Sequence, residues 1–566
     1  MPHAFLESRL VGLLLAPMAG VLLWAAFPDQ GAWPLTIAGT AVLHLALRRD
    51  HAGWGFLVAL VAGLTFFLPH VFWAYHATAL VPWLALGLLG GLGVATFGAA
   101  WTWTRRLAWV RERAWVHVLA FATVWTAVEQ WRSEVPWGGF PWGRLGWSVA
   151  GAPTGRAAWL GGVPLVSFLL AAAGALLAVA VTRAVGAVRD RPARGRQWGS
   201  VAVCVVVGGV LVWGPAALPL PRAAGTAAVA DPPVTATVEA PDRSAFVDAG
   251  TSVAQSGVLR AGIVQGNVPN PGDDAAYNAA AVLRNHLDGT RALAGDAATR
   301  AAAGGEGTAL DVVLWPEDST GYDPQHEHTV ASMLDDVARE TGTPLLLGAQ
   351  EWPATGGRYN VMLLWQEGQG VTQRYAKQHP APFGEYIPWR PLFRLFSSQV
   401  DRVTTDMIAA TNPPVVDVPA PVLGRQVRVG LAICFEVAYD EILRDAVRRG
   451  AQVLVVPTNN ASFGTSPEST QQLQMTRLQA IASGRAAVQV STVGVSGVIA
   501  PDGTLVARTG LFTADRINAL LPLRTTWTPA VAAGYWPGWV VSATGGLLAL
   551  GGLASGMARR RRASAA

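Results

Sequence analysis

The sequence predicts a multi-pass transmembrane α-helical bundle joined to one α/β domain. Of its 566 residues, 51% are hydrophobic and only 14% are charged, which is unusual for a soluble protein. Long uncharged runs crowd roughly the first 220 residues, and one more lies near the C-terminus. Between them, short β-rich runs alternate with amphipathic segments in a stretch of ordinary globular composition.

The apolar runs have the length of membrane spans. A transmembrane helix needs about 20 mostly apolar residues, and this criterion predicts about eight spans. They cover residues 10–27, 33–48, 53–74, 80–104, 114–131, 159–182, 199–219 and 536–557. The first run has features of a signal peptide, but the spans that follow favour a retained helix.

Arginine placement predicts the orientation of these spans. Basic residues in short loops favour the cytoplasmic side of a membrane. Clusters begin at Arg48, Arg105 and Arg183 and recur at Arg559–Arg562, in loops that fall on one side. We therefore expect both termini to be cytoplasmic and residues 220–535 to be extracytoplasmic. The arginines that set the orientation of the spans then account for the net charge of +5, and no nucleic-acid partner is expected.

Composition divides the chain into four parts. We expect a bundle at 1–219, a linker at 220–257, a catalytic α/β domain at 258–525, and a last helix with a basic tail at 526–566. The strands expected in the α/β domain are LRAGIVQG, DVVLWPE, PLLLGA, NVMLLW, VRVGLAI, QVLVVPT, AVQVST and VSGVIA. Helices are expected near 276–294, 328–341, 437–449 and 468–484.

Three segments place reactive side chains at the ends of predicted strands. They are WPEDS with Glu317, YAKQHPAPFGEYIP with Lys377 and Glu385, and LAICFE with Cys434 and Glu436. Lys377 is the only lysine among 42 basic residues, and Cys434 is the only cysteine outside the apolar runs. Together these segments offer a base, a cation and a nucleophile.

This set suits acyl transfer through a thioester. Glu317 could take the proton of the Cys434 thiol, and Lys377 with the backbone N–H of Phe435 could stabilise a tetrahedral oxyanion. Taken singly, a buried small cysteine, a capping carboxylate and a solvated lysine are the commoner interpretations. Their joint occurrence favours a site. Glu385 and Glu436 could instead hold a loop or pair with an arginine.

The order of these motifs resembles that of a known family. WPE, YAKQHPAPFGEYIP, ICFE and PTNNASFG follow one another as in the nitrilase superfamily, and with the preceding helices the chain is similar to bacterial apolipoprotein N-acyltransferases. The resemblance covers nearly the whole chain. It departs from the family pattern at Phe435, Ser462 and Ala482.

The resemblance implies an αββα catalytic domain with a Glu317, Lys377 and Cys434 triad and accessory Glu385. It implies that Cys434 takes an acyl chain from a membrane phospholipid and passes it to the α-amine of a diacylglyceryl-cysteine on an apolipoprotein. The location implied is the bacterial inner membrane. The substrates keep their acyl chains in the bilayer, which suits a membrane enzyme.

Further residues are candidates for substrate contacts. The Trp-rich loop EVPWGGFPWGRLGW contains Trp137, Phe140 and Trp142, which could admit lipid or could form an ordinary interfacial aromatic belt. Asn459 and Asn460 follow another predicted strand.

Two other functions compete with acyl transfer. A membrane-anchored amidase would use the same triad to hydrolyse a small amide, but an anchor needs only one span. A transporter or scaffold would usually carry more ionisable residues within its spans, where Glu129 is the clearest candidate. No metal-ligand spacing or nucleotide-binding motif is present, so no metal or cofactor is expected.

Overall fold

The chain folds into two compact units. The structure, a computed structural model, describes residues 8–189, 194–222, 228–229, 243–268, 279–302 and 309–565. One unit comprises Met1–Tyr75, Leu80–Leu218 and Ala533–Ala566, and the other comprises His76–Ala79 and Pro219–Ala532.

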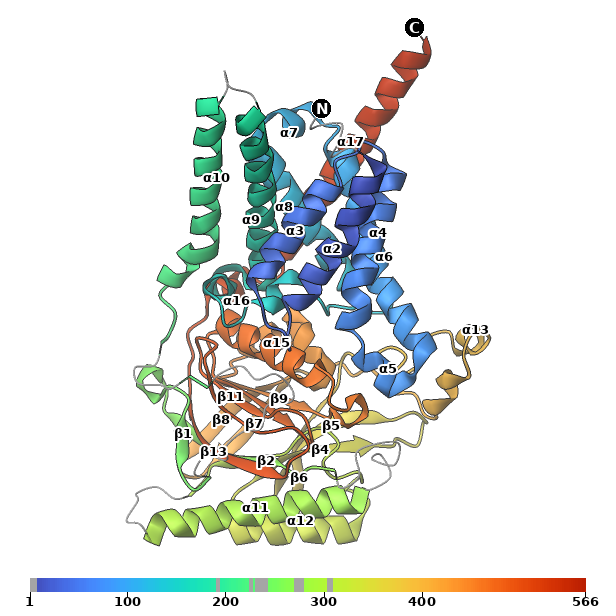
Figure 1. Cartoon of the computed structure of the whole chain (residues 1–566). Helices are drawn as coiled ribbons and strands as arrows, with labels where there is room; N and C mark the ends of the chain where they lie inside the picture. Colours follow the sequence, from blue (N-terminus) through green and yellow to red (C-terminus); the bar gives the residue numbers. More distant parts are fainter. Residues whose placement is uncertain are drawn as a thin grey trace. The chain divides into compact units, whose positions relative to one another are not determined.

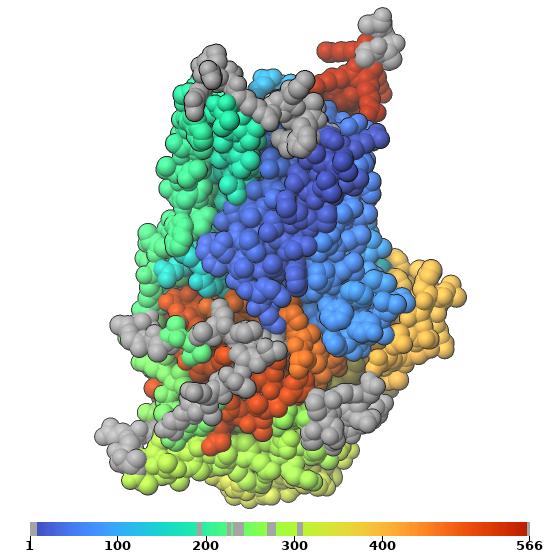
Figure 2. Space-filling view, viewed as in Figure 1, coloured from blue at the N-terminus to red at the C-terminus, as the bar shows by residue number. Residues whose placement is uncertain are grey.

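The first unit is helical. Its helices are α2 (Arg9–Ala25), α3 (Pro34–Ala46), α4 (Ala52–His70), α5 (Trp73–Thr78), α6 (Leu80–Thr104), α7 (Ala108–Glu112), α8 (Ala114–Arg132), α9 (Ala158–Arg189), α10 (Arg194–Trp213) and α17 (Trp536–Ala565) (Figure 1). Short 3-10 turns lie at Leu145–Ser148, Pro153–Ala157 and Gly214–Ala217. Figure 2 shows the N-terminal residues of this unit, in blue, on one face of it, where α2 packs against α3 and α4.

Several of these helices have the dimensions of membrane spans. Within the described residues, five are long and apolar enough to cross a membrane: Ala52–His70, Leu80–Thr104, Pro153–Val188, Gly195–Ala217 and Trp536–Arg562. The apolar helices Arg9–Ala25 and Pro34–Ala46 are shorter. Helix α8 is not in this set, because Glu129, Gln130 and Arg132 make its end polar. The prediction of a multi-pass helical bundle is confirmed.

Glycines allow close packing between helices of the bundle. A Cβ at Gly98 of α6 would lie 2.4 Å from the Cβ of Ala59 and 2.4 Å from the carbonyl oxygen of Gly55, both on α4. No larger side chain fits there without moving a backbone. Small residues of this kind let membrane helices approach closely and gain van der Waals contact.

The second unit contains two stacked β-sheets. The seven-stranded sheet has the order β1-β13-β2-β3-β4-β5-β6, and the six-stranded sheet has the order β12-β11-β10-β9-β8-β7. The strands are β1 (Phe246–Asp248), β2 (Val258–Gln265), β3 (Val312–Leu314), β4 (Leu345–Glu351), β5 (Tyr359–Gln366), β6 (Gly370–Ala376), β7 (Val415–Ala420), β8 (Arg425–Leu431), β9 (Val453–Thr458), β10 (Ala487–Ser491), β11 (Gly497–Ile499), β12 (Leu505–Arg508) and β13 (Asp515–Pro522).

Helices cover the outer faces of both sheets. One apolar core lies between the sheets, and a second joins the seven-stranded sheet to α11 (Ala279–Ala302) and α12 (His328–Thr341), which lie side by side (Figure 1). Helix α12 contributes Val330, Leu334 and Val337 at helical spacing. Helices α14 (Asp440–Arg448) and α15 (Glu468–Ser483) pack on the six-stranded sheet. This arrangement confirms the αββα prediction.

Shorter elements complete the second unit. They are α13 (Arg390–Arg394), α16 (Pro529–Ala533) and the 3-10 turns Thr251–Val253, Ser398–Arg402, η7 (Cys434–Ala438) and Ala461–Phe463. Within the range expected to be linker, residues 223–227 and 230–242 lie outside the described residues, whereas β1 pairs in parallel with β13. The predicted domain boundaries stay a prediction.

Candidate active site

The candidate residues gather where strands end. Strand β3 runs parallel to both neighbours, as does β9 in the other sheet, so the carboxyl ends of these strands share an edge. Glu317 follows β3, Lys377 follows β6, Cys434 follows β8 and Asn459 follows β9. The placement at strand ends is therefore as the sequence predicts.

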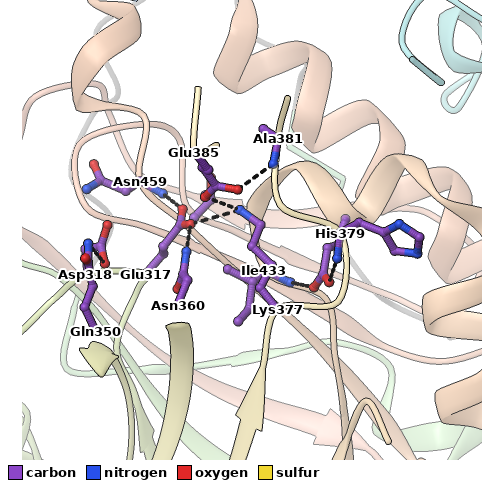
Figure 3. A network of polar contacts seen from close by, with 12 residues as sticks. Glu317, Asp318, Gln350, Asn360, Lys377, His379, Ala381, Glu385, Ile433 and Asn459 are labelled. Atoms are coloured by element: carbon purple, nitrogen blue, oxygen red, sulfur yellow. Dashed lines mark hydrogen bonds and ion pairs between the residues drawn. The ribbon is translucent and has the colours of Figure 1, made fainter. Parts of the chain in front are cut away.

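Glu317 is buried and held by three donors. Its Oε1 accepts from Asn360 Nδ2 at 2.5 Å and from Lys377 Nζ at 3.3 Å, and its Oε2 accepts from the backbone N–H of Asn459 at 2.8 Å (Figure 3). These contacts fix the orientation of the Glu317 carboxylate through both of its oxygens. Burial raises the pKa of Glu317 to about 7, although Lys377 opposes that rise.

Lys377 lies between two carboxylates. Its side chain is 1% exposed, and besides the contact with Glu317 its Nζ donates to Glu385 Oε1 at 2.7 Å (Figure 3). Glu385 Oε2 accepts from the backbone N–H of Ala381 at 2.6 Å. Burial lowers the pKa of Lys377, but Glu385 and Glu317 outweigh it and hold that pKa well above its usual value. Lys377 is therefore an ammonium.

Cys434 sits on a strained turn. It opens η7 with φ +54°, a left-handed conformation that costs a non-glycine residue energy and is kept where the surroundings impose it. Its side chain is partly exposed. Desolvation and Glu317 raise the pKa of Cys434 well above the ordinary thiol value, against Lys377. The resting residue is thus a thiol that needs a base.

Glu436 holds this turn in place. Its Oε2 accepts from the Ile433 N–H at 2.7 Å, and its Oε1 accepts from the N–H groups of Gln378 and His379 at 2.6 and 3.1 Å. The Tyr375 hydroxyl also donates to it. Glu436 thereby ties the turn that carries Cys434 to the segment that follows Lys377, which is a positioning role.

The two asparagines differ. Asn459 offers its backbone N–H to Glu317 and is half-buried. Asn460 is 2% exposed, and its Nδ2 donates to Glu468 Oε2 at 2.5 Å and to Gln472 Oε1 at 3.1 Å. The side chain of Asn460 is therefore occupied by protein partners.

The aromatic loop belongs to the helical unit. Phe140 and Trp142 are buried there, and Trp142 meets Trp73 edge-on at 5.5 Å between ring centroids. Trp137 is half-buried with φ +52°. A lipid contact by these three residues stays a prediction. Trp137 is the least buried of the three.

Sequence reasoning missed several supporting residues. Asn360 donates to Glu317 from β5, Tyr375 donates to Glu436 from β6, and Gln350 donates to Asp318 Oδ1 at 2.9 Å. Asn360 and Gln350 lie inside strands that no motif marks, whereas Tyr375 opens the YAKQHPAPFGEYIP segment without a feature that predicts its partner. Among the described residues, no group of three or more His, Cys, Asp and Glu side chains is placed to hold a metal ion.

Two family models match this chain. The carbon-nitrogen hydrolase family model matches residues 260–526, and the model of the apolipoprotein N-acyltransferase N-terminal domain matches residues 19–176. A solved structure of Saccharomyces cerevisiae Nit3, a member of the nitrilase superfamily, is 16% identical, covering 50% of this chain and 94% of that one with a TM-score of 0.33.

Full-length relatives carry one name. Apolipoprotein N-acyltransferase of Mycolicibacterium smegmatis is 33% identical over 535 residues, covering 93% of this chain and 82% of that protein. The Pseudomonas aeruginosa enzyme is 30% identical over 549 residues, covering 93% of each chain. A helical membrane unit with a nitrilase-type domain defines a membrane acyltransferase of the nitrilase superfamily. Within that class, the chain belongs to the apolipoprotein N-acyltransferase family.

Proposed function

We propose that this enzyme transfers an acyl chain from a membrane phospholipid to the N-terminal α-amine of the diacylglyceryl-cysteine of apolipoproteins, through a thioester on Cys434. The observation that carries the proposal is the convergence of a buried carboxylate, Glu317, an ammonium, Lys377, and a thiol, Cys434, in a member of this family. Membrane lipid and lipoprotein substrates suit a chain with several apolar helices.

In the first half-reaction, Glu317 takes the thiol proton and the Cys434 sulfur attacks the ester carbonyl of the phospholipid. The Lys377 ammonium and the Phe435 N–H stabilise the oxyanion that forms. As the intermediate collapses, the carbon–sulfur bond remains and the carbon–oxygen bond breaks. Glu317 returns the proton to the leaving oxygen, and lysophospholipid departs.

In the second half-reaction, the neutral α-amine of the lipoprotein attacks the thioester carbonyl. Glu317 accepts a proton from the nitrogen, the carbon–sulfur bond breaks, and the proton passes to the departing Cys434 thiolate. The products are an amide and free thiol, so the cycle is ping-pong. Because Glu317 accepts and returns one proton in each half, its pKa of about 7 suits both directions.

The orientation is also part of the proposal. The arginines Arg559–Arg562 near the C-terminal end of α17 and the loop at Arg105 support cytoplasmic termini and an extracytoplasmic catalytic unit in the bacterial inner membrane. Reporter fusions test this arrangement. Alkaline phosphatase joined after residue 566 is expected to be inactive, and joined after Gly424, a surface turn of the catalytic unit, active. The reverse pattern would overturn the orientation.

Intact mass of the purified full-length protein after incubation with phospholipid tests the thioester. Wild type and the matched variant Cys204→Ala are expected to gain an acyl mass that hydroxylamine removes, while Cys434→Ser gains none of that kind. A hydroxylamine-sensitive adduct that persists in Cys434→Ser would contradict the proposal, whereas a hydroxylamine-resistant ester on the new serine would not. Adding a lipoprotein substrate separates the amidase alternative, since hydrolysis would release free fatty acid instead of an N-acylated product.

A further inference from the structure

A cluster of buried polar side chains lies next to the candidate nucleophile, Cys434, and has no role in the two half-reactions described above. It comprises Thr458, Gln472, Asn460, Glu468 and Ser491, which are all nearly or fully buried. Thr458 ends β9, and Gln472 and Glu468 lie on α15. Burial of polar groups costs free energy unless they are hydrogen-bonded, so the contacts within this cluster decide how its side chains are oriented.

Thr458 connects the cluster to the reacting atom. Strands β8 and β9 pair in parallel with Leu431 opposite Val455, which places Thr458 at the end of β9 beside the turn that begins at Cys434. A hydrogen bond from the Thr458 side chain lowers the pKa of the Cys434 thiol, against the larger effect of burial, and Thr458 Oγ1 donates to Gln472 Oε1 at 2.8 Å. A hydroxyl has one hydrogen and two lone pairs. Facing a thiol, Thr458 can accept the S–H while donating to Gln472. Facing a thiolate, which only accepts, it must turn its hydrogen to the sulfur to keep the bond.

Gln472 is fixed in the orientation that permits this exchange. Its Oε1 also accepts from Asn460 Nδ2 at 3.1 Å, while Asn460 Oδ1 accepts from Ser491 Oγ at 2.5 Å. Ser491 Oγ in turn accepts from the Gly494 N–H at 2.8 Å. This chain of donors points the oxygen of the Gln472 amide, and not its nitrogen, at Thr458.

The orientation of Gln472 carries a cost. Its Nε2 is buried and has no hydrogen-bond partner within the part of the chain that the structure describes. A buried unsatisfied donor is rare and needs an explanation. A fixed acceptor for the Thr458 hydroxyl in the resting enzyme is such an explanation.

We propose that Thr458 is a further catalytic residue, whose hydroxyl turns from Gln472 Oε1 to the Cys434 sulfur whenever the thiolate is present. This happens when the thiol is deprotonated and again when the thioester releases its sulfur. The thiol proton passes to Glu317 as before, and no covalent bond of Thr458 changes. The inference rests on the proposed role of Cys434 as nucleophile.

The charges around Cys434 show why a neutral donor matters. The charged groups that act on its sulfur are Lys377 after β6, Glu317 after β3 and Glu468 on α15. The two carboxyl groups disfavour a thiolate, and Lys377 is already shared between Glu317 and Glu385. A hydroxyl adds stabilisation of the thiolate without adding a charge to this crowded site.

The test is the pH dependence of Cys434 alkylation by iodoacetamide, which reports thiolate directly. The full-length protein is used in a Cys204→Ala background so that Cys434 is its only thiol. Thr458→Val keeps the shape and removes the hydroxyl. Its alkylation midpoint is expected to rise by about one pH unit, with about tenfold slower alkylation below the midpoint. Thr458→Ser is expected to keep the wild-type profile.

Gln472→Met is a second variant, for which the alkylation midpoint is expected to shift in the opposite direction. Losing the competing acceptor leaves the Thr458 hydroxyl free for the sulfur, so the alkylation midpoint is expected to fall. Thr476→Val is the matched control, since Thr476 is equally buried on α15 but donates to Gln489 Oε1 at 2.9 Å. Its profile is expected to stay at that of wild type. General loosening of the site would move both α15 variants in the same direction.

An unchanged midpoint in folded Thr458→Val, or equal shifts in Thr458→Val and Thr476→Val, would overturn the inference. If Thr458→Val does not fold, an unchanged or raised midpoint in Gln472→Met overturns it. The role of Cys434 is judged separately, by whether the wild-type acyl adduct maps to that residue. An adduct at Cys434 with an unshifted Thr458→Val profile removes only the role of Thr458.

Discussion

Both units of the protein bury charged side chains, but the α8 end of the helical unit and the candidate active site satisfy these charges differently. In the helical unit, Arg132 donates to the carbonyl oxygens of Phe140 and Trp142, at 2.5 and 2.7 Å. Glu129 accepts from the Leu145 N–H at 2.9 Å and from Trp125 Nε1 at 2.8 Å. These contacts attach the aromatic loop to α8 largely through its backbone.

At the candidate active site of the α/β unit, charged groups face one another instead. Lys377 Nζ contacts Glu317 and Glu385, and the Cys434 thiol completes the set. A charge bonded to backbone groups fixes a chain conformation and has no proton to exchange with them. Charges that meet other titratable side chains can pass protons. The partners of a buried charge therefore separate structural from chemical roles.

The largest expected effect is at Glu317. Glu317→Gln is expected to slow acylation of Cys434 about 10³-fold, because the general base is lost. The carboxyl is protonated below its raised pKa of about 7, so wild-type acylation should rise with pH through about 7 and then level off. Single-turnover acylation followed by intact mass measures both the loss of rate and its pH dependence. The acylation rate of Glu317→Gln should show no inflection near pH 7. Glu351→Gln, which removes one partner of the exposed Arg374, is the matched control.

At Lys377 the expected loss is about 10²-fold to 10³-fold in kcat for Lys377→Met, since the cation beside the oxyanion disappears. Lys377→Arg should recover little, because a planar guanidinium does not replace a compact ammonium. Arg374→Met, three residues earlier on β6, serves as the control for loss of a nearby cation. Near-normal turnover by folded Lys377→Met would mean that Lys377 has a structural role and does not stabilise the oxyanion.

Arg132→Met tests the structural side of the comparison. Two carbonyl oxygens lose their donor, so the free energy of unfolding is expected to fall by about 2 kcal/mol. The rate at which iodoacetamide alkylates Cys434 should stay that of wild type. Thermal denaturation in detergent and the alkylation assay measure the two. Arg111→Met, at an exposed arginine of α7, should change neither. Slower alkylation of Cys434 in Arg132→Met would contradict a purely structural role for Arg132.

The smallest effect is expected at Tyr375. Tyr375→Phe removes one donor to Glu436 but leaves the three backbone donors, so turnover should fall roughly fivefold. Steady-state kinetics with Tyr359→Phe from β5 as the control gives the comparison. A loss as large as that at Lys377 would mean that Glu436 does more than hold the turn.

The sequence predicts the fold well because strands and helices leave local patterns, whereas the roles assigned to the reactive residues stay predictions. All eight predicted strands and all four predicted helices of the α/β unit overlap strands and helices of the structure. The strands that were missed are β1, β6, β7, β12 and β13. The first four are sheet edges: β1 and β12 are only three and four residues long, and polar residues or proline interrupt the apolar pattern of β6 and β7. In β13, charged Asp515 and Arg516 hide a buried strand.

The supporting contacts could not be predicted in the same way. Asn360 reaches Glu317 across 43 residues of sequence, and Tyr375 reaches Glu436 across 61. Such pairs depend on strand register and on the stacking of two sheets, which no single segment encodes. Glu436 illustrates the limit, since its type and position suggested either pairing with an arginine or holding a loop, and only its partners identify the latter.

The left-handed backbone at Cys434 also restricts which nucleophiles this scaffold could have used. A β-branched side chain is a genuine outlier at positive φ, so threonine, the nucleophile of some other hydrolases, is excluded at this position on conformational grounds. Serine fits the same backbone. A change from a sulfur to an oxygen nucleophile at position 434 would therefore require serine. The reactivity of the serine hydroxyl, and not the backbone conformation, would decide whether such a variant works.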